Sequence, residues 1–202
     1  MQTNAWVMCE DFPCSDVNSK NYVVPAASVD PEKIKIVMIA EVPPENLRDY
    51  FYADGDPAFL QTTIKTFRNA GADVSNIDDI LALGIYITTP VKCGKTGYGI
   101  ASKNVEACSY LLEKELKLFP NTIAILAMGD VAIKAVNHVS RRQTGKRAIR
   151  AGSTYKIRRE TYCFGETRVF PSYLPTGRSY LIEKSKQRMI AEDIRTALTM
   201  VG

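Results

Sequence analysis

Four cysteines are the residues of this sequence that could hold a metal. Cys93 lies in an expected loop after a strand, and Cys108 lies fifteen positions later on the first turns of an expected helix. Cys9 and Cys14 lie in an N-terminal stretch with little other means of anchorage. Four thiolates without a nearby histidine suit a 4Fe–4S cluster, with a Cys₄ zinc site as the alternative. Cys108 also shares a helix face with apolar residues, so burial as a small hydrophobe is the competing interpretation.

Glu41 is a candidate catalytic group. It follows a short apolar run directly and precedes Val42-Pro43-Pro44. A carboxylate at the carboxyl end of a strand can orient a water molecule or stabilise a developing cation. A solvated loop glutamate is the competing interpretation.

Two further features could bind phosphate. The first is a basic stretch with no acidic residue before Glu160, made up of Arg141, Arg142, Lys146, Arg147, Arg150, Lys156, Arg158 and Arg159. Such arrays bind phosphate backbones with an affinity that falls as salt rises, although a solvated basic loop would look the same. The second is Gly129-Asp130 at an expected helix start, where exposed amides can receive a phosphate and where Asp130 could equally be a plain N-cap.

Composition narrows the class of protein. The chain has 202 residues, 46% of them hydrophobic and 24% charged, which is the balance of one folded domain over residues 1–202. The net charge of +4 favours an anionic partner, and a single histidine, His138, excludes zinc sites with two histidines. No apolar run approaches a membrane span, and residues 1–14 lack the pattern of a secretory signal. An odd number of cysteines then indicates reduced thiols, and we expect a cytoplasmic protein.

The order of elements predicts an α/β fold. Apolar runs at 34–40, 84–89 and 122–128 are typical of buried strands, and 155–163 with 167–173 predict a hairpin. Helical patterns occur near 57–71, 78–83, 104–119, 130–139 and 179–200, while 1–32 is irregular. Alternating strands and helices predict a three-layer sandwich with a central, mostly parallel four-stranded sheet flanked by helices. Ligands of such sheets bind beyond the carboxyl ends of the strands.

Six segments, taken in order, resemble motifs of one known family. Ala40-Glu41-Val42-Pro43-Pro44 stands where the family has Gly-Glu-x-Pro-Gly, and Gly55-Asp56-Pro57-Ala58-Phe59 stands where it has Gly-x-Pro-Phe. Thr88-Thr89-Pro90-Val91-Lys92-Cys93 matches Thr-Asn-x-x-Lys-Cys, and Glu106-Ala107-Cys108 matches Glu-x-Cys. Ala127-Met128-Gly129 matches a strand ending in Leu-Gly, and Leu174-Pro175-Thr176 matches His-Pro-Ser. From about Cys9 to Ala197 the sequence therefore resembles the uracil-DNA glycosylase superfamily, in particular its iron–sulfur branch.

The resemblance implies that the protein flips a damaged base out of DNA and hydrolyses its N-glycosidic bond. Glu41 would position the water, and Phe59 or Tyr52 would stack on the base. Thr88 and Thr89 would lie at the base edge, with Thr89 in place of an asparagine, and Leu174 would replace the histidine that donates to the leaving base. Gly129 and Thr176 of the matched motifs would contact the DNA, and from the basic stretch we expect Arg141, Arg142, Lys146 and Arg147 to do so as well.

The resemblance also implies a structural 4Fe–4S cluster on Cys9, Cys14, Cys93 and Cys108. It would tie the N-terminal segment 1–32 to the loop after the second strand. The N-terminal spacing here is C-x₄-C, whereas the branch has C-x₂-C. Cys163 has no counterpart in the family, and we expect it to pack in its strand.

Thr89 in place of the asparagine and Leu174 in place of the histidine predict weak or absent uracil excision unless another residue compensates. Leucine donates nothing to a leaving base, and loss of one preorganised donor costs about 10²–10³ in rate. Arg178, four positions after Leu174, is the evident cationic substitute. A DNA-binding or damage-sensing module without catalysis is the second hypothesis, and an unrelated nucleotide-binding α/β protein is the third. We expect a monomer that binds single- or double-stranded DNA and no membrane.

Overall fold

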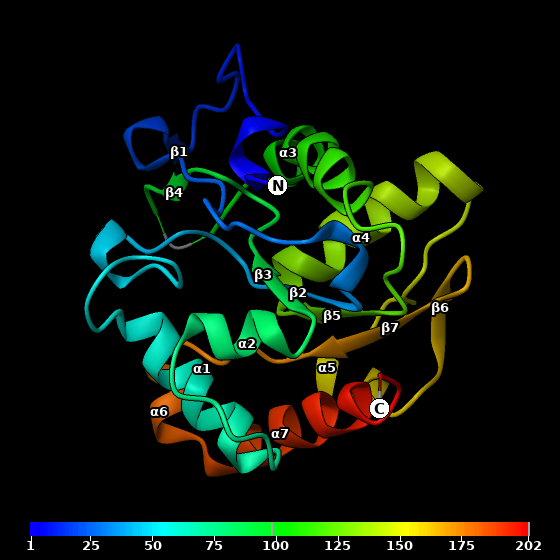
Figure 1. Ribbon diagram of the computed structural model, residues 1–202. Coiled ribbons are helices and arrows are strands. Elements are labelled where there is room, and N and C mark those ends of the chain that lie inside the picture. The colour runs from blue at the N-terminus through cyan, green and yellow to red at the C-terminus, as the bar shows by residue number, and fades with distance from the viewer. Residues whose placement is uncertain (98, 202) are drawn as a thin grey trace.

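A five-stranded sheet forms the centre of the molecule in the computed structural model (Figure 1), which describes residues 1–97 and 99–201 but not the side chains of Arg178 and Ser179. The strand order is β3-β2-β5-β7-β6. The first four of these run parallel: β3 (Ile85–Thr88), β2 (Ile36–Ile39), β5 (Ala124–Met128) and β7 (Thr167–Ser172). The edge strand β6 (Tyr162–Phe164) is antiparallel to β7. The α/β class and the mostly parallel sheet are confirmed, but the sheet has five strands rather than the expected four.

Alternate residues of each strand face opposite sides of the sheet, and both sides are apolar. On β2, Val37 and Ile39 belong to one core cluster, while Ile36 and Met38 belong to the other. Helices therefore pack on both faces (Figure 1). The first face is covered by α3 (Ser102–Leu116) and α4 (Asp130–Thr144), and the second by α1 (Ala58–Asn69), α2 (Ile77–Ala82), α6 (Gly177–Ile182) and α7 (Lys184–Leu198).

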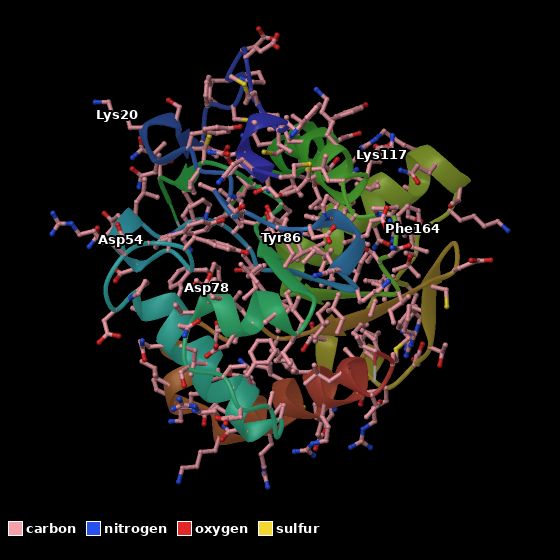
Figure 2. The ribbon with its side chains drawn as sticks, viewed as in Figure 1. Lys20, Asp54, Asp78, Tyr86, Lys117 and Phe164 are labelled. Atoms are coloured by element: carbon pink, nitrogen blue, oxygen red, sulfur yellow. The ribbon has the colours of Figure 1, made fainter. Side chains whose placement is uncertain are left out.

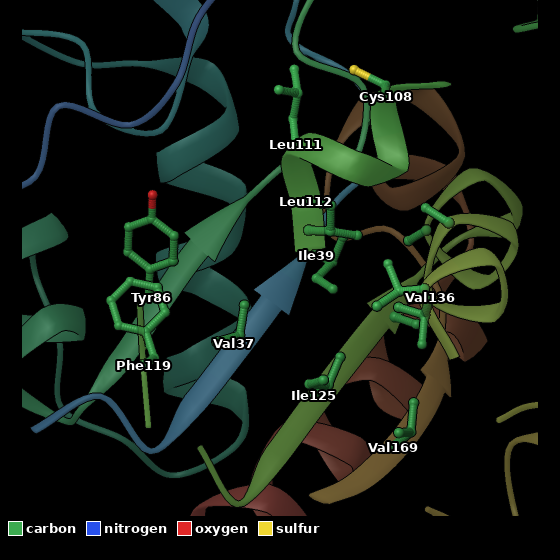
Figure 3. Packing of buried hydrophobic residues seen from close by; sticks show 14 of the residues in the cluster. Val37, Ile39, Tyr86, Cys108, Leu111, Leu112, Phe119, Ile125, Val136 and Val169 are labelled. Atoms are coloured by element: carbon green, nitrogen blue, oxygen red, sulfur yellow. The ribbon is translucent and has the colours of Figure 1, made fainter. Parts of the chain in front are cut away.

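The first of these layers is shown from close by in Figure 3. Leu112 of α3 and Val136 of α4 lie over Val37 and Ile125 of the sheet. Cys108 lies on α3 one helical turn before Leu112. Figure 2 draws the side chains of the whole molecule, and Tyr86, which is fully buried, lies near its centre. None of the helices in the described part of the chain is long and apolar enough to span a membrane.

The region before β7 differs from the expected hairpin. Residues 154–157 form the short helix α5 (Thr154–Ile157) instead of the start of a strand, because Ile157 and Thr154 are buried while Tyr155 points to solvent. The strand shortens to β6, at the sheet edge. Cys163 is exposed there, so the expectation that it packs in its strand is wrong.

The N-terminal segment 1–32 packs onto the first helical layer. Val7, Val24 and Val29 are buried in the cluster that contains α3. The two-residue strands β1 (Val17–Asn18) and β4 (Gly94–Lys95) pair antiparallel, which ties this segment to the loop after β3. Short 3-10 turns lie at Thr3–Ala5, Ser19–Asn21, Pro31–Lys33 and Leu47–Asp49. The segment is thus held by apolar contacts and by one small sheet.

Candidate active site and cysteine group

The carboxyl ends of four strands lie at one edge of the sheet. The register pairs Ile39 with both Thr88 and Ala127, and Met128 with Ser172. The chain leaves the sheet at this edge in four places, and a cavity of about 650 Å³ lies there. Its lining includes Glu41, Phe59, Leu174 and Thr176. Residues that are more than 130 positions apart in the sequence therefore share one cavity of the size that small-molecule sites have.

Glu41 lies against the first residues of α4. Gly129, with a φ of +100°, approaches so closely that a Cβ there would lie 2.9 Å from both Cγ and Cδ of Glu41. Burial, the strongest influence, raises the pKa of Glu41, and the negative charge of Asp130 acts in the same direction. The backbone N–H groups of Val131 and Asp130 face the carboxylate and lower its pKa, as does the charge of Lys95, but the net shift is upward. The helix start that the sequence suggested for phosphate is therefore faced by a protein carboxylate, and Gly129 contacts Glu41.

Of the two aromatic residues expected at the base, only Phe59 lines the cavity. Tyr52 is bound to the edge of the sheet instead. Its hydroxyl donates to the carbonyl of Ile87 at 2.9 Å and accepts from the N–H of Ile87 at 3.0 Å. Because β3 is an edge strand, Tyr52 satisfies backbone groups that would otherwise be unpaired.

Thr88 and Thr89 are both fully buried and do not line the cavity. The Thr88 hydroxyl donates to the Glu115 carboxylate and accepts from the ammonium of Lys92 at 2.7 Å. Tyr86 donates to the same carboxylate at 2.7 Å. Thr88 is thus part of a buried network around the Lys92–Glu115 ion pair. The Thr89 hydroxyl has no hydrogen-bond partner among the described residues.

The chain matches the family model of the uracil DNA glycosylase superfamily over residues 27–197. The chain belongs to this superfamily. A comparison with curated proteins finds no match. Membership agrees with the arrangement described above, in which Glu41, Phe59 and Leu174 meet at one sheet edge.

Lys95 is a site residue of this superfamily member that the sequence analysis missed. It belongs to β4, lines the cavity and lowers the pKa of Glu41. The loop 92–102 is visibly rich in glycine and lysine, but nothing in the sequence indicated which lysine would face Glu41. The side chain of Arg178, expected to compensate for Leu174, lies outside what the structure describes.

The four cysteines of this superfamily member lie near one another. Cys9, Cys14 and Cys108 line a second cavity of about 260 Å³ between the N-terminal segment and α3. Burial and the nearby thiols of Cys108, Cys9 and Cys14 raise the pKa of Cys93 to about 12. The N–H of Lys92 donates to the Cys108 sulfur at 3.3 Å. Within residues 1–97 and 99–201, no group of three or more histidine, cysteine or acidic side chains has the arrangement of a single-ion site.

The basic stretch contains residues that pair with other side chains and residues that face solvent. Arg142 connects α4 to α3: its Nε donates to Glu113 at 2.9 Å, Nη1 donates to Ser109 at 2.8 Å, and its guanidinium lies 3.9 Å above the Tyr110 ring. Arg158 is buried and bound to Asp193. Arg150 pairs with Glu160, which is partly exposed.

Arg141 and Arg147 are exposed and line a cavity of about 380 Å³ along α4, together with Lys134 and His138. Lys146 is exposed nearby. The structure thus leaves Arg141, Lys146 and Arg147 facing solvent, whereas Arg142 holds two helices together.

Proposed function

We propose that the protein flips a deaminated base such as uracil out of DNA and hydrolyses its N-glycosidic bond, with Glu41 positioning the attacking water. The observation that carries this proposal is the cavity at the carboxyl edge of the sheet. Glu41, an acid with a raised pKa, and Phe59, an aromatic ring, line it together. A nucleotide must leave the duplex to reach such a recess.

The chemistry follows from the residues that line this cavity. Phe59 would stack on the face of the base. As the glycosidic bond breaks, the sugar develops positive charge and the base leaves with negative charge. The ionised Glu41 would stabilise the sugar cation and hold a water molecule for attack on C1′. Lys95 would add a positive charge at the same cavity, where it could offset the charge of the leaving base.

Glu41→Gln tests this proposal because it preserves shape and removes the acid. Base release from a deoxyuridine oligonucleotide should fall by at least about 100-fold, while the affinity for DNA should change little. Glu166→Gln, an exposed carboxylate in the turn before β7, is the matched control. If Glu41→Gln releases uracil as fast as the unaltered protein, the proposed role of Glu41 is wrong.

A second candidate is DNA binding or damage sensing without catalysis. Leu174 favours it, because an aliphatic side chain lines the cavity where a donor to the leaving base would be needed. Thr89, the other replaced position, is buried behind the cavity rather than in its lining. Under this alternative, the unaltered protein binds deoxyuridine oligonucleotides and releases no base at any pH.

We also propose that Cys9, Cys14, Cys93 and Cys108 hold a 4Fe–4S cluster, with a Cys₄ zinc site as the alternative. Three of the four thiols border one cavity, and the fourth is close enough for its pKa to respond to them. A metal bound there would add covalent links between the N-terminal segment and α3, which is a structural role. Iron, sulfide and zinc analysis of protein purified without oxygen distinguishes the two.

The proposed partner is single- or double-stranded DNA, bound by a monomer. Arg141, Lys146 and Arg147 support this, since they are exposed and the net charge of the chain is positive. Thr176, in the cavity lining, would contact the flipped nucleotide. The five free thiols favour a reducing compartment, so we propose the cytoplasm.

A further inference from the structure

The loop that joins Cys9 to Cys14 depends on other segments for its shape. Four residues separate the two cysteines, and one of them, Phe12, has a positive φ of 43°. Residues other than glycine rarely adopt this left-handed conformation, because it brings the Cβ close to the following carbonyl oxygen. Both cysteines are only partly buried. Contacts from elsewhere in the chain must therefore hold the loop, and two side chains supply them.

The first of these side chains is Tyr22, which holds the start of the loop. Its hydroxyl accepts a hydrogen bond from the N–H of Cys9 at 3.1 Å and donates one to the carbonyl of Val7 at 3.1 Å. Its ring meets the ring of Phe12 edge to face, with the two centroids 5.2 Å apart. A single side chain thus fixes the backbone at Cys9 and packs against the middle of the loop.

Tyr22 is itself anchored to the loop that carries Cys93. The N–H of Val23 donates to the carbonyl of Lys92 at 2.8 Å. Burial, the largest influence, raises the pKa of Tyr22 to about 12, and the thiols of Cys108 and Cys93 are near enough to add to the rise. Tyr22 therefore lies close to these thiols and connects the N-terminal segment to the loop after β3.

The second side chain is Asp16, which holds the end of the loop against α3. One carboxylate oxygen accepts from the N–H of Ala101 at 2.6 Å, and the other accepts from the side-chain amide of Asn104. Ala101 precedes α3 and offers the helix no side-chain cap, so Asp16 satisfies a backbone N–H at the helix start. Cys14 lies two positions before Asp16, and Cys108 lies on α3 (Figure 3). The contact therefore joins the segment of one cysteine to the helix of another.

We propose that Tyr22 and Asp16 position the loop of residues 9–14 so that its two cysteines bind a metal together with the other two. This inference rests on the proposed metal site at the four cysteines. Contacts that orient metal ligands from outside the coordination shell are worth about 10- to 100-fold in metal affinity. They also account for the longer C-x₄-C spacing, because Phe12, one of the four intervening residues, packs on Tyr22.

Metal release from the loaded protein tests this inference. Tyr22→Phe removes the hydroxyl and keeps the ring, and Asp16→Ala removes the carboxylate. The protein is purified without oxygen, and the release of iron or zinc to the chelating dye pyridylazoresorcinol is followed well below the melting temperature. Thermal unfolding of the metal-free variants shows separately whether the fold is weakened.

Each variant has a matched control away from the cysteines. Tyr155→Phe also removes a tyrosine hydroxyl, from a side chain that is 71% exposed. Asp79→Ala also removes a carboxylate that accepts from backbone N–H groups at a helix start, in α2 on the other face of the sheet.

Tyr22→Phe and Asp16→Ala should each release metal roughly 10-fold faster than the unaltered protein. The two controls should release it at the unaltered rate. The melting temperatures of the metal-free variants should match those of their own controls. Tyr22→Phe keeps the apolar ring, and each aspartate variant loses a contact of the same kind at the start of one helix.

Release at the rate of the controls would overturn the inference and leave the proposed metal site standing. Faster release together with a melting temperature well below that of the matched control would also overturn it, because the side chain would then support the fold in general. Failure of the proposed metal site looks different: the unaltered protein would carry neither iron nor zinc, and it would take up neither when supplied with zinc or with iron and sulfide. That result would overturn both proposals.

Discussion

Gly129→Ala should disable the candidate site by displacing Glu41. A Cβ at position 129 would lie 2.9 Å from Cγ and Cδ of Glu41, whereas carbon atoms in contact are about 3.5–4.0 Å apart. Glu41 must therefore move by roughly 0.5–1 Å. A shift of about 1 Å in a positioned group can cost about 100-fold in rate, so base release should fall by roughly 10- to 100-fold.

The same change should also lower stability. Gly129 has φ +100° and ψ 170°, a conformation that other residues adopt at a cost of about 1–3 kcal/mol. For a domain of this size, that corresponds to a fall of about 2–12 °C in melting temperature. Single-turnover base release and thermal unfolding followed by circular dichroism measure the two effects.

Gly145→Ala is the matched control at the other end of α4. Gly145 has φ +74°, but a Cβ there would meet nothing within 4 Å. It should lose stability to its backbone conformation, by about 1–2 kcal/mol, and keep its rate of base release. A second comparison places Gly129→Ala in the Glu41→Ala background, where the contact is gone and the loss of stability should be smaller. Equal losses in both backgrounds, with base release like that of Gly145→Ala, would refute the reasoning.

Three other predictions follow from individual contacts. Arg147→Ala should weaken DNA binding and reduce the slope of log affinity against log salt by about 1. Arg142→Ala should chiefly lower the melting temperature, because it breaks contacts between α3 and α4. Fluorescence anisotropy in a salt series measures the first effect, and thermal unfolding measures the second. Base release should rise with pH through the raised pKa of Glu41, because only the carboxylate form positions the water, and the inflection of a pH–rate profile should vanish in Glu41→Gln. Cys93→Ser should remove most bound iron and sulfide, while exposed Cys163→Ser should leave the metal content unchanged; equal loss in both would contradict the cysteine assignment.

The sequence was most informative where a segment is buried on both sides. The apolar runs at 34–40, 84–89 and 122–128 contain β2, β3 and β5, because a strand covered by helices on both faces needs apolar residues at every position. Residues 155–163 were harder to interpret. They mix buried and exposed side chains in a pattern that fits a short helix or an edge strand equally well, and contacts with the rest of the fold decide between them.

The topology of the sheet made the position of the cavity predictable, but it did not indicate which side chains pair with each other. Parallel strands bring their carboxyl ends together, so Glu41 and Leu174 could be expected at one edge, whereas Phe59, at the start of α1, was expected there from the family resemblance. The role of Arg142 depends on Glu113, twenty-nine positions away, and nothing local indicates that pairing. A count of charges along residues 141–159 therefore overestimates the surface available to DNA.

The ionisation of Glu41 is a property of the assembled edge and not of the strand-end motif alone. Burial raises its pKa, whereas the N–H groups at the start of α4 and the charge of Lys95 lower it. Burial alone would favour the protonated acid, which could not accept a proton from water. Full exposure would leave the carboxylate surrounded by solvent and free to adopt many orientations, so that it would not hold one water molecule in place. Gly129 permits the close approach of the helix amides to this acid. Three segments distant in sequence therefore set the pKa of this acid, and with it the pH range in which it can serve as a base.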